Sequence, residues 1–383
     1  MPQRRRPKGE GSTYCDKHGQ WWAQITIDGR LIRRRCPSRK AASERLAELR
    51  RLRDDGMSVA GGSQTVESFL NEWYNAVIAR RALTETTRSY YRVLITNHIL
   101  PYLDTRRLDS LEHADMQRWI DRLSPTMAPR ALALFRDALG WAVRRRYIRF
   151  DPTADVIVPV ATSSSGRAWT TDELARLFVA APTEYHLLYQ VLVTLGLRLG
   201  EALALQWTDI DWQQAAIAIA RQVQEVAYPD GTRLETNNPP KTAAGIRTLP
   251  LPPRLLRQLE RAYAVIAADY VQRGVAWSGH GPIFTDSQGG FWWPHNLSRR
   301  FRQHRAAAGL PTDLHLHLLR HTCASWLDAT GASEATRAAI LGHAKKTVTE
   351  RYTHPLLETM RAALTTVERT YLNPLADATE DVA

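Results

Sequence analysis

Residues 341–354 have the sequence LGHAKKTVTERYTH, which places a tyrosine after a basic turn. We expect one helix to end at Leu341 and Gly342, and a short polar helix at 347–352 to carry Tyr352. His343 lies nine residues before this tyrosine. Such a tyrosine is usually a packing residue, because a phenol with a pKa of about 10 is a poor nucleophile unless cations surround it. Whether this tyrosine can react therefore depends on cations supplied by the rest of the chain.

Two upstream segments offer arginine and histidine. Arg198 stands between Gly196 and Gly200, and flanking glycines let a backbone come close to a ligand. His317 and Arg320 are three residues apart, so a helix would place them on one face. Arg198 taken alone also suits an ordinary surface position, whereas packing does not explain a basic pair on the edge of an apolar helix. Their combination is what favours a functional site.

A lone lysine is the third candidate. The chain has six lysines and 45 arginines, and Lys241 is the only lysine between residues 41 and 344. Lysine can give up a proton near neutral pH and arginine cannot. Lys241 therefore suits a general acid. Glu201, one helical turn after Arg198, suits a residue that orients a cation or caps a helix better than one that reacts.

In this order, these residues resemble the motifs of the tyrosine recombinases, the phage integrase family. The resemblance implies six catalytic residues, which are Arg198, Lys241, His317, Arg320, His343 and Tyr352. The matching segments are TLGLRLGEALALQW (194–207), PPKTAAGIRTLPLP (239–252), HLHLLRHTCASWL (315–327) and LGHAKKTVTERYTH (341–354). The chain departs from the family at Leu318, where an acidic residue often follows the histidine. This departure puts the local support of the site in doubt, but not its chemistry.

The resemblance also implies the chemistry, which is DNA strand exchange through a covalent phosphotyrosine. The tyrosine attacks a backbone phosphorus and the 5′ oxygen leaves. The two arginines clamp the non-bridging oxygens. His317 moves the tyrosine proton, Lys241 protonates the leaving oxygen, and His343 donates a hydrogen bond to the phosphate. This chemistry requires no metal and no nucleotide cofactor, and the sequence contains neither a P-loop nor a carboxylate cluster.

Positive charge is concentrated at the N-terminus. Residues 1–60 hold 15 of the 51 Lys and Arg residues but only 7 of the 39 Asp and Glu residues. This distribution suits a domain that contacts nucleic acid, joined to a larger and nearly neutral part. A basic tail that only aids solubility is the alternative. Three cysteines without a CxxC pair indicate reduced thiols, and Cys15, His18 and Cys36 lack a fourth ligand for zinc.

The first sixty residues nevertheless have the pattern of a folded domain. Trp21 to Ile27 alternate in the manner of a strand, Asp28-Gly29 is a two-residue hairpin signal, and Ser38 should cap a helix that ends near Asp55. We expect a three-stranded sheet backed by this helix, resembling an arm-site-binding domain. We expect its free face to enter a DNA major groove, and an ordinary solvated face is the alternative. The residues expected to contact DNA there are Trp22, Gln24, Thr26, Arg33, Arg34 and Arg35.

The rest of the chain is predicted to be mainly α-helical with small sheets. Residues 1–60 form the arm-type domain, 64–150 a bundle of four helices resembling a core-site-binding domain, 168–372 a mixed α+β catalytic domain, and 373–383 a flexible tail. Arg80 and Arg81 at the end of the first bundle helix contact phosphate or are solvated. In the catalytic domain we expect strands at 215–226 and 247–251, and helices at 185–195, 253–272, 294–308, 317–330, 334–341, 347–352 and 356–371.

The helix that follows Tyr352 leaves two interpretations open. Its apolar face would carry Leu356, Met360, Ala363, Leu364 and Val367. This face packs on its own domain, or it docks on a neighbouring protomer of a tetramer, as the resemblance implies. No apolar run reaches the length of a membrane span.

We expect a cytoplasmic, nucleoid-associated integrase in a bacterial host, which joins double-stranded attachment sites of a phage or mobile element. A directionality factor or a host DNA-bending protein could assist it. The alternatives are a transposon-type recombinase, a recombinase that resolves plasmids or chromosomes, and a type IB topoisomerase. A catalytically inactive DNA-binding protein is a further alternative, which the complete set of six residues disfavours.

Overall fold

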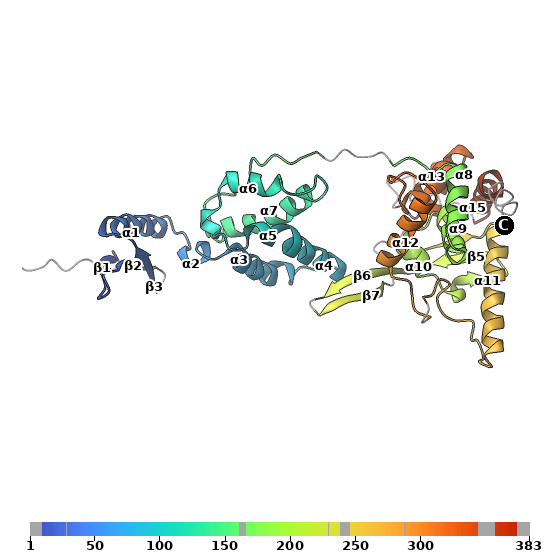
Figure 1. The fold of residues 1–383 in the computed structure, drawn as a ribbon, viewed down its shortest axis with the longest axis horizontal. Helices are drawn as coiled ribbons and strands as arrows, with labels where there is room; N and C mark the ends of the chain where they lie inside the picture. Colours follow the sequence, from blue (N-terminus) through green and yellow to red (C-terminus); the bar gives the residue numbers. More distant parts are fainter. Residues whose placement is uncertain are drawn as a thin grey trace, which may run out of the picture. The chain divides into compact units, whose positions relative to one another are not determined.

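The computed structural model describes residues 10–373 except 28, 161–165, 229, 238–245, 287–288 and 344–356. The chain divides into two compact units, Met1–Thr162 and Ser163–Ala383 (Figure 1). The predicted fold class is confirmed, because both units are mainly helical and carry small antiparallel sheets. Within the described ranges, no helix has the length and apolar character needed to cross a membrane.

The first unit begins with the expected sheet and helix. Strands β1 (Ser12–Cys15), β2 (Trp21–Ile27) and β3 (Arg30–Cys36) form an antiparallel sheet in that order. Helix α1 (Arg39–Asp54) follows, and the Ser38 hydroxyl accepts a hydrogen bond from the backbone N–H of Ala41. A small core holds the helix on one face of the sheet and is formed by Ala23, Ile25, Ile27, Cys36, Ala42, Leu46 and Leu49.

A helical bundle completes this unit. Thr65 and Thr84 cap its first two helices, as threonine does where a helix begins in extended backbone. Its elements are α3 (Val66–Trp73), the π-helical η1 (Tyr74–Ile78), α4 (Glu85–Leu94), the π-helical η2 (Ile95–Ile99), α5 (Leu100–Leu103), the 3-10 turn η3 (Leu108–Ser110), α6 (His113–Ile120) and α7 (Ala128–Arg144). The buried core of the bundle continues to Val156. A short helix, α2 (Val59–Gly62), lies between α1 and α3 in the sequence.

The second unit has eight helices of the α series among its described residues, and the predicted helix bounds are close to those observed. These helices are α8 (Thr171–Ala180), α9 (His186–Leu195), α10 (Leu199–Leu203), α11 (Pro253–Gln272), α12 (Pro294–Ala307), α13 (Leu318–Ala329), α14 (Glu334–Leu341) and α15 (Leu357–Val367). Single helical turns are η4 (Thr183–Tyr185), η5 (Trp207–Asp209) and η8 (Glu368–Leu372). The helix predicted at 347–352 and the tail after Asn373 lie outside the described residues.

The strand predicted at 215–226 is wrong, because two strands of different sheets occupy this range. Strand β5 (Ala216–Ile219) lies between β4 (Ile210–Asp211) and β8 (Arg247–Pro250), whereas β6 (Gln222–Tyr228) forms a hairpin with β7 (Gly231–Asn237). The chain breaks between them at Arg221, whose guanidinium pairs with Asp209. Both strands bury apolar residues, so the apolar pattern continues across Arg221. Periodicity alone could therefore not reveal that the strand ends there.

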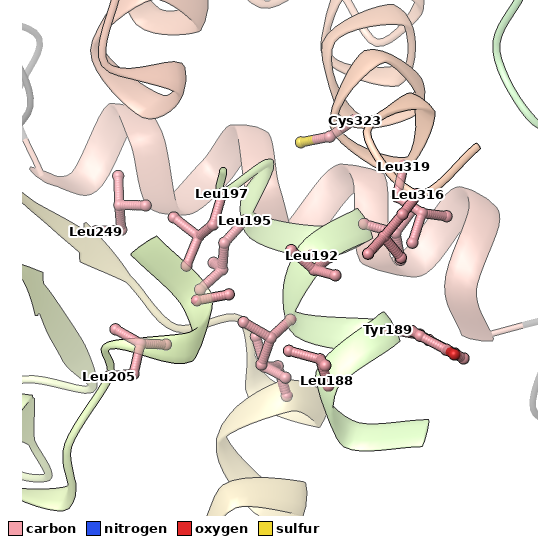
Figure 2. Close-up of a cluster of buried hydrophobic side chains, with 14 of the residues drawn as sticks. Leu188, Tyr189, Leu192, Leu195, Leu197, Leu205, Leu249, Leu316, Leu319 and Cys323 are labelled. Carbon is pink, nitrogen blue, oxygen red and sulfur yellow. The ribbon is translucent and has the colours of Figure 1, made fainter. Parts of the chain in front are cut away.

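Helix α9 lies at the centre of the large core of this unit. Its leucines pack against residues of α13 and β8 around the turn that follows α9 (Figure 2). Helix α15 packs against α9, α13, α14 and β8, and it buries Met360, Leu364 and Val367. The described part of this helix therefore packs on its own domain, which is the first of the two interpretations. Leu356 lies outside the described residues.

Candidate active site

Arg198 is placed by a sharp turn at the end of α9. Gly196 closes that helix in the left-handed region, with φ of 61°. A Cβ atom on Gly196 would lie 2.6 Å from Cδ2 of Leu341 and 3.0 Å from Sγ of Cys323, so a side chain has no room there. Arg198 then becomes the N-cap of α10. Its side chain remains 44% exposed, so its guanidinium is accessible to a ligand.

Glu201 holds Arg198 in place through two hydrogen bonds. Its carboxylate accepts hydrogen bonds from Nη1 of Arg198 (2.8 Å) and from the backbone N–H of the same residue (3.0 Å). The glutamate is only 2% exposed. Burial alone would raise its pKa, but Arg247 and Arg198 outweigh this effect and hold the pKa of Glu201 below its usual value. The carboxylate stays ionised and orients a cation, as its spacing from Arg198 predicts.

Arg320 joins two helix ends at the site. Its guanidinium donates from Nη1 to the carbonyl oxygen of Gly196 and from Nη2 to that of Leu341, both at 2.6 Å. The residue is 6% exposed. Burial, followed by the charge of Arg198, lowers the pKa of Arg320 to about 10, so the guanidinium remains charged at neutral pH. Its remaining N–H groups are suited to an anion.

His317 stands at the N-cap of α13, one turn before Arg320. Desolvation lowers the pKa of His317, and the neighbouring charges of His321, Arg320, His315 and Arg198 lower it further. The imidazole is therefore neutral at neutral pH and can accept a proton. A cavity of about 280 Å³ reaches it and leaves it accessible; the lining residues are Leu192, Leu197, Leu199, Ser298, Phe301, Arg302, His315, Leu316 and His317.

His343 follows the end of α14. Gly342 terminates this helix in the left-handed region with φ of 65°, and the backbone N–H of His343 donates to the carbonyl oxygen of Ala338 at 3.0 Å. The imidazole is exposed. Because Leu341 accepts a bond from Arg320, His343 is held near that arginine.

Four of the six residues implied by the resemblance are thus described, and the fold brings their segments together. Arg320 bonds to Gly196, two residues before Arg198, and to Leu341, two residues before His343. His317 lies within the electrostatic influence of both arginines. Lys241 and Tyr352 lie outside the described residues. The described groups form a cationic site with a neutral base, which suits the binding of a phosphodiester.

Leu318, the departure from the family pattern, belongs to the core. It is 2% exposed, and a Cβ atom on Gly166 would lie 2.5 Å from its Cδ2 atom. The next turn of α13 carries Thr322, whose hydroxyl accepts from the backbone N–H of Trp169 at 2.8 Å. The side of α13 at Leu318 therefore supports the fold through apolar packing, while Arg320 and His317 form the site.

Arg247 is a site residue that the sequence analysis missed. It is the first residue of β8, its side chain is 8% exposed, and its Nη2 atom lies 3.0 Å from Oε2 of Glu201. Its Nε atom donates to the carbonyl oxygen of Ile340 at 2.8 Å. The feature of the sequence that could have indicated Arg247 is its place six residues after Lys241, as a charged residue at the start of an apolar strand. Burial of that charge could not be deduced from the sequence.

The register of the N-terminal sheet divides the arginines proposed to contact DNA. Arg33 pairs with Gln24 and Arg35 with Trp22, so these side chains share the face opposite α1 with Thr26. Both arginines are exposed. Arg34 pairs with Ala23, a buried residue, and therefore lies on the other face. The sheet-face argument applies to Arg33 and Arg35 and does not extend to Arg34.

Two other side chains on this face are already engaged in the domain. Nε1 of Trp22 donates to Oδ2 of Asp16 at 2.9 Å, and Nε2 of Gln24 donates to the hydroxyl of Ser12 at 2.9 Å. Thr26 is exposed. These bonds order the face. The indole edge of Trp22 and one amide N–H of Gln24 are consequently committed to intradomain contacts.

The arginine pair in the bundle contains one structural residue. Arg81 forms a two-pronged ion pair with Asp137 of α7, at 2.6 and 3.2 Å. This pair fastens the end of the first bundle helix to α7. Arg80 is exposed. Of the two, Arg80 is the better candidate for a phosphate contact.

Comparisons with known proteins identify two matching families. The phage integrase family matches residues 168–358, and the phage integrase N-terminal SAM-like domain matches residues 65–124. An integrase of Streptomyces ambofaciens is 27% identical over 362 residues, which cover 91% of this chain and 92% of the relative.

Solved structures show the same fold. A lambda integrase dimer bound to a COC' core site has a TM-score of 0.56 at 17% identity, and the match covers 92% of this chain and 96% of that one. The Tn1549 transposon integrase in complex with a circular intermediate DNA has a TM-score of 0.55 at 18% identity, covering 80% of this chain and 100% of that one.

Proposed function

Since the chain belongs to the phage integrase family of tyrosine recombinases, we propose that it is an integrase that inserts or excises a mobile element by breaking and rejoining DNA strands. The observation that carries this proposal is the pair of bonds from Arg320 to Gly196 and Leu341, because they gather Arg198, Arg320, His317 and His343 at one site. A cationic site with a neutral imidazole is what strand cleavage at a phosphodiester requires.

Tyr352 attacks the phosphorus, forms the phosphotyrosyl bond and releases the 5′ oxygen. Arg198 and Arg320 hold the non-bridging oxygens, where negative charge accumulates in the transition state. Loss of one such preorganised donor typically lowers the rate by about 10²–10³. Neutral His317 accepts the tyrosine proton, and Lys241 protonates the leaving oxygen. His343 donates a hydrogen bond to a phosphate oxygen.

The N-terminal sheet favours an element-encoded integrase over a recombinase that resolves plasmids or chromosomes. A domain of this kind before the core-binding bundle supplies a second class of DNA contact, and its exposed face bears Arg33 and Arg35. We assign arm-site binding to this domain and core-site binding to the bundle. Both kinds of site would lie in double-stranded attachment DNA within a bacterial host.

The active assembly is a homotetramer on DNA. The structural relatives include a lambda integrase tetramer bound to a Holliday junction, with a TM-score of 0.54. The apolar face of α15 packs on its own domain, so this face is not free for contacts between protomers.

The first prediction tests the nucleophile. In Tyr352→Phe, DNA affinity should stay within about twofold of wild type, because the phenol is not needed for binding, but no covalent adduct should form. The assay uses a nicked suicide duplex carrying the core sequence taken from the junction between the element and its host chromosome. Denaturing gel electrophoresis detects the adduct, in EDTA and without ATP. A covalent adduct in this variant would disprove the assignment, and a wild-type protein that forms none would disprove the proposed function.

A further inference from the structure

Arg247 connects two parts of the candidate active site. Its guanidinium lies 3.0 Å from Glu201, the residue that holds Arg198, and donates to the carbonyl oxygen of Ile340 at 2.8 Å. The side chain is 8% exposed. An arginine buried to this degree is retained only where its charge and N–H groups are satisfied.

The second bond places Arg247 beside the contact of Arg320. Ile340 and Leu341 are consecutive residues at the end of α14, and their carbonyl oxygens accept from Arg247 and Arg320 respectively. The last carbonyls of a helix lack partners within the helix and carry the negative end of its dipole. Two arginines therefore neutralise and fix the helix end from which His343 follows.

We propose that Arg247 is a positioning residue for strand cleavage, which sets Arg198 through Glu201 and His343 through the end of α14. This inference rests on the proposed function of the same site. Arginine suits the role because its planar fork can hold a carboxylate and a carbonyl oxygen at once, whereas lysine presents a single point charge. The contacts with Glu201 and Ile340 assign Arg247 a role that acts through these residues.

The charge of Arg247 also controls Glu201. Among the residues that the structure describes, the charged groups around this carboxylate are Arg198, Arg247 and Arg320. Burial pushes the pKa of Glu201 upward, and Arg247 is the first of the two partners that reverse this shift. Without Arg247, the pKa of Glu201 rises. At lower pH the carboxylate then takes up a proton and weakens its hold on Arg198, and at higher pH it ionises and recovers this hold.

The experiment compares Arg247→Gln with wild type on the nicked suicide duplex carrying the element's core site. We expect single-turnover cleavage at saturating protein to fall at least tenfold, while DNA affinity stays within twofold. The cleavage defect should be largest at low pH and shrink as the pH rises. In the double variant Arg247→Gln/Glu201→Gln, the defect should not change with pH, because no carboxylate remains to titrate.

Two further variants separate positioning from stability. Arg361→Gln removes an arginine that donates to the carbonyls of Gln214 and Ala215, neither of which belongs to the proposed site. It should therefore lower the unfolding temperature without a cleavage defect. Arg247→Lys should retain part of the cleavage rate, and it replaces the glutamine variant if that protein fails to fold. The inference would be overturned if Arg247→Gln cleaved at the wild-type rate, or if Arg247→Lys did so where only that variant folds. A cleavage defect in Arg247→Gln that did not depend on pH would also overturn it. Absence of cleavage by the wild-type protein would instead refute the proposed function.

Discussion

His317 owes its suitability as a base to its neighbours. Desolvation lowers its pKa from the ordinary value of 6.5, and the charge that lowers it most after that is His321, whose ring centroid lies 5.2 Å away. Protonation of His317 therefore costs more in the folded protein than in the unfolded chain. His317 therefore lowers the free energy of unfolding as the pH falls below 6.5, and it has no such effect above this pH.

The second prediction concerns the pH profile of cleavage. The wild-type rate on the nicked core duplex should rise as His317 loses its proton and level off, with a midpoint below 6.5. His321→Asn removes a positive charge that opposes protonation, so the pKa of His317 and the midpoint should both move upward. Single-turnover rates measured across the pH range provide the check. A midpoint that is unchanged or lower in His321→Asn would contradict this account.

At the scale of residues, candidate reactive groups could be proposed from the sequence, but the residues that support them could not. Arg198, His317 and Arg320 could be proposed because glycines, spacing and residue type are visible in the chain. The bonds of Arg320 to two carbonyl oxygens could not, because they depend on which helix ends meet at α13. Arg247 was missed for the same reason. A charge at a strand terminus is ordinarily solvated, and only the folded chain shows that Glu201 lies against it.

Among the secondary-structure elements, α11 is stabilised by a residue distant in sequence. Pro252 occupies its N-cap and provides no side-chain hydrogen bond. Instead, the carboxylate of Glu368, in η8, accepts from the backbone N–H groups of Arg254 (3.0 Å) and Leu255 (2.9 Å). The glutamate is 4% exposed. A negative charge at a helix N-terminus is favourable, so this contact locks the C-terminal segment onto α11.

The third prediction follows from this cap. Glu368→Ala should lower the free energy of unfolding by about 1–3 kcal/mol, because two N–H groups at the start of α11 lose their acceptor. Denaturant unfolding measures the change. Glu358→Ala is the matched control: its carboxylate is 78% exposed and lies 3.5 Å from Arg361. Its effect should stay within about 0.5 kcal/mol. Equal losses in the two variants would show that Glu368 is not a cap.

Sequence periodicity located the helices well and the strands less well. The prediction of 253–272 coincides with α11, because apolar residues repeat at helical spacing between a proline and a glycine. Strand β7 was not foreseen, since Gly231–Asn237 reads GTRLETN and is mostly polar. It is paired along its length with β6, so its strand character comes from backbone pairing with a neighbour. Local hydrophobicity carries no information on such pairing.

At the scale of the whole molecule, the sequence indicated the order of the parts through charge and composition. Residues 1–60 hold most of the net charge of +12. The structure shows where the N-terminal sheet and α1 can be separated from the bundle by truncation. The backbone N–H of Ser58 bonds to the carbonyl of Arg146 at 2.8 Å, so the segment beginning at Ser58 belongs to the bundle.

The fourth prediction is that deletion of residues 1–57 removes one class of DNA site. The deleted segment contains the whole of the sheet and α1, so contacts to arm sites should disappear. Cleavage of the nicked core duplex should persist within about tenfold, because all six proposed catalytic residues remain. Footprinting on the attachment DNA and the cleavage assay test the two statements. Unchanged footprints would reject the arm-site assignment.

The bonds of arginine to backbone carbonyls have a consequence for the ionic behaviour of the protein. Several guanidinium groups outside the proposed phosphate clamp hold chain segments together in this way, namely Arg136, Arg176, Arg247, Arg305 and Arg361. Their charge is counted in the net value of +12. A guanidinium that donates to a carbonyl oxygen is less available to bind a DNA phosphate and displace a counterion from it. The number of counterions released on binding should therefore be smaller than the net charge suggests, and it should fall most when the N-terminal domain is removed.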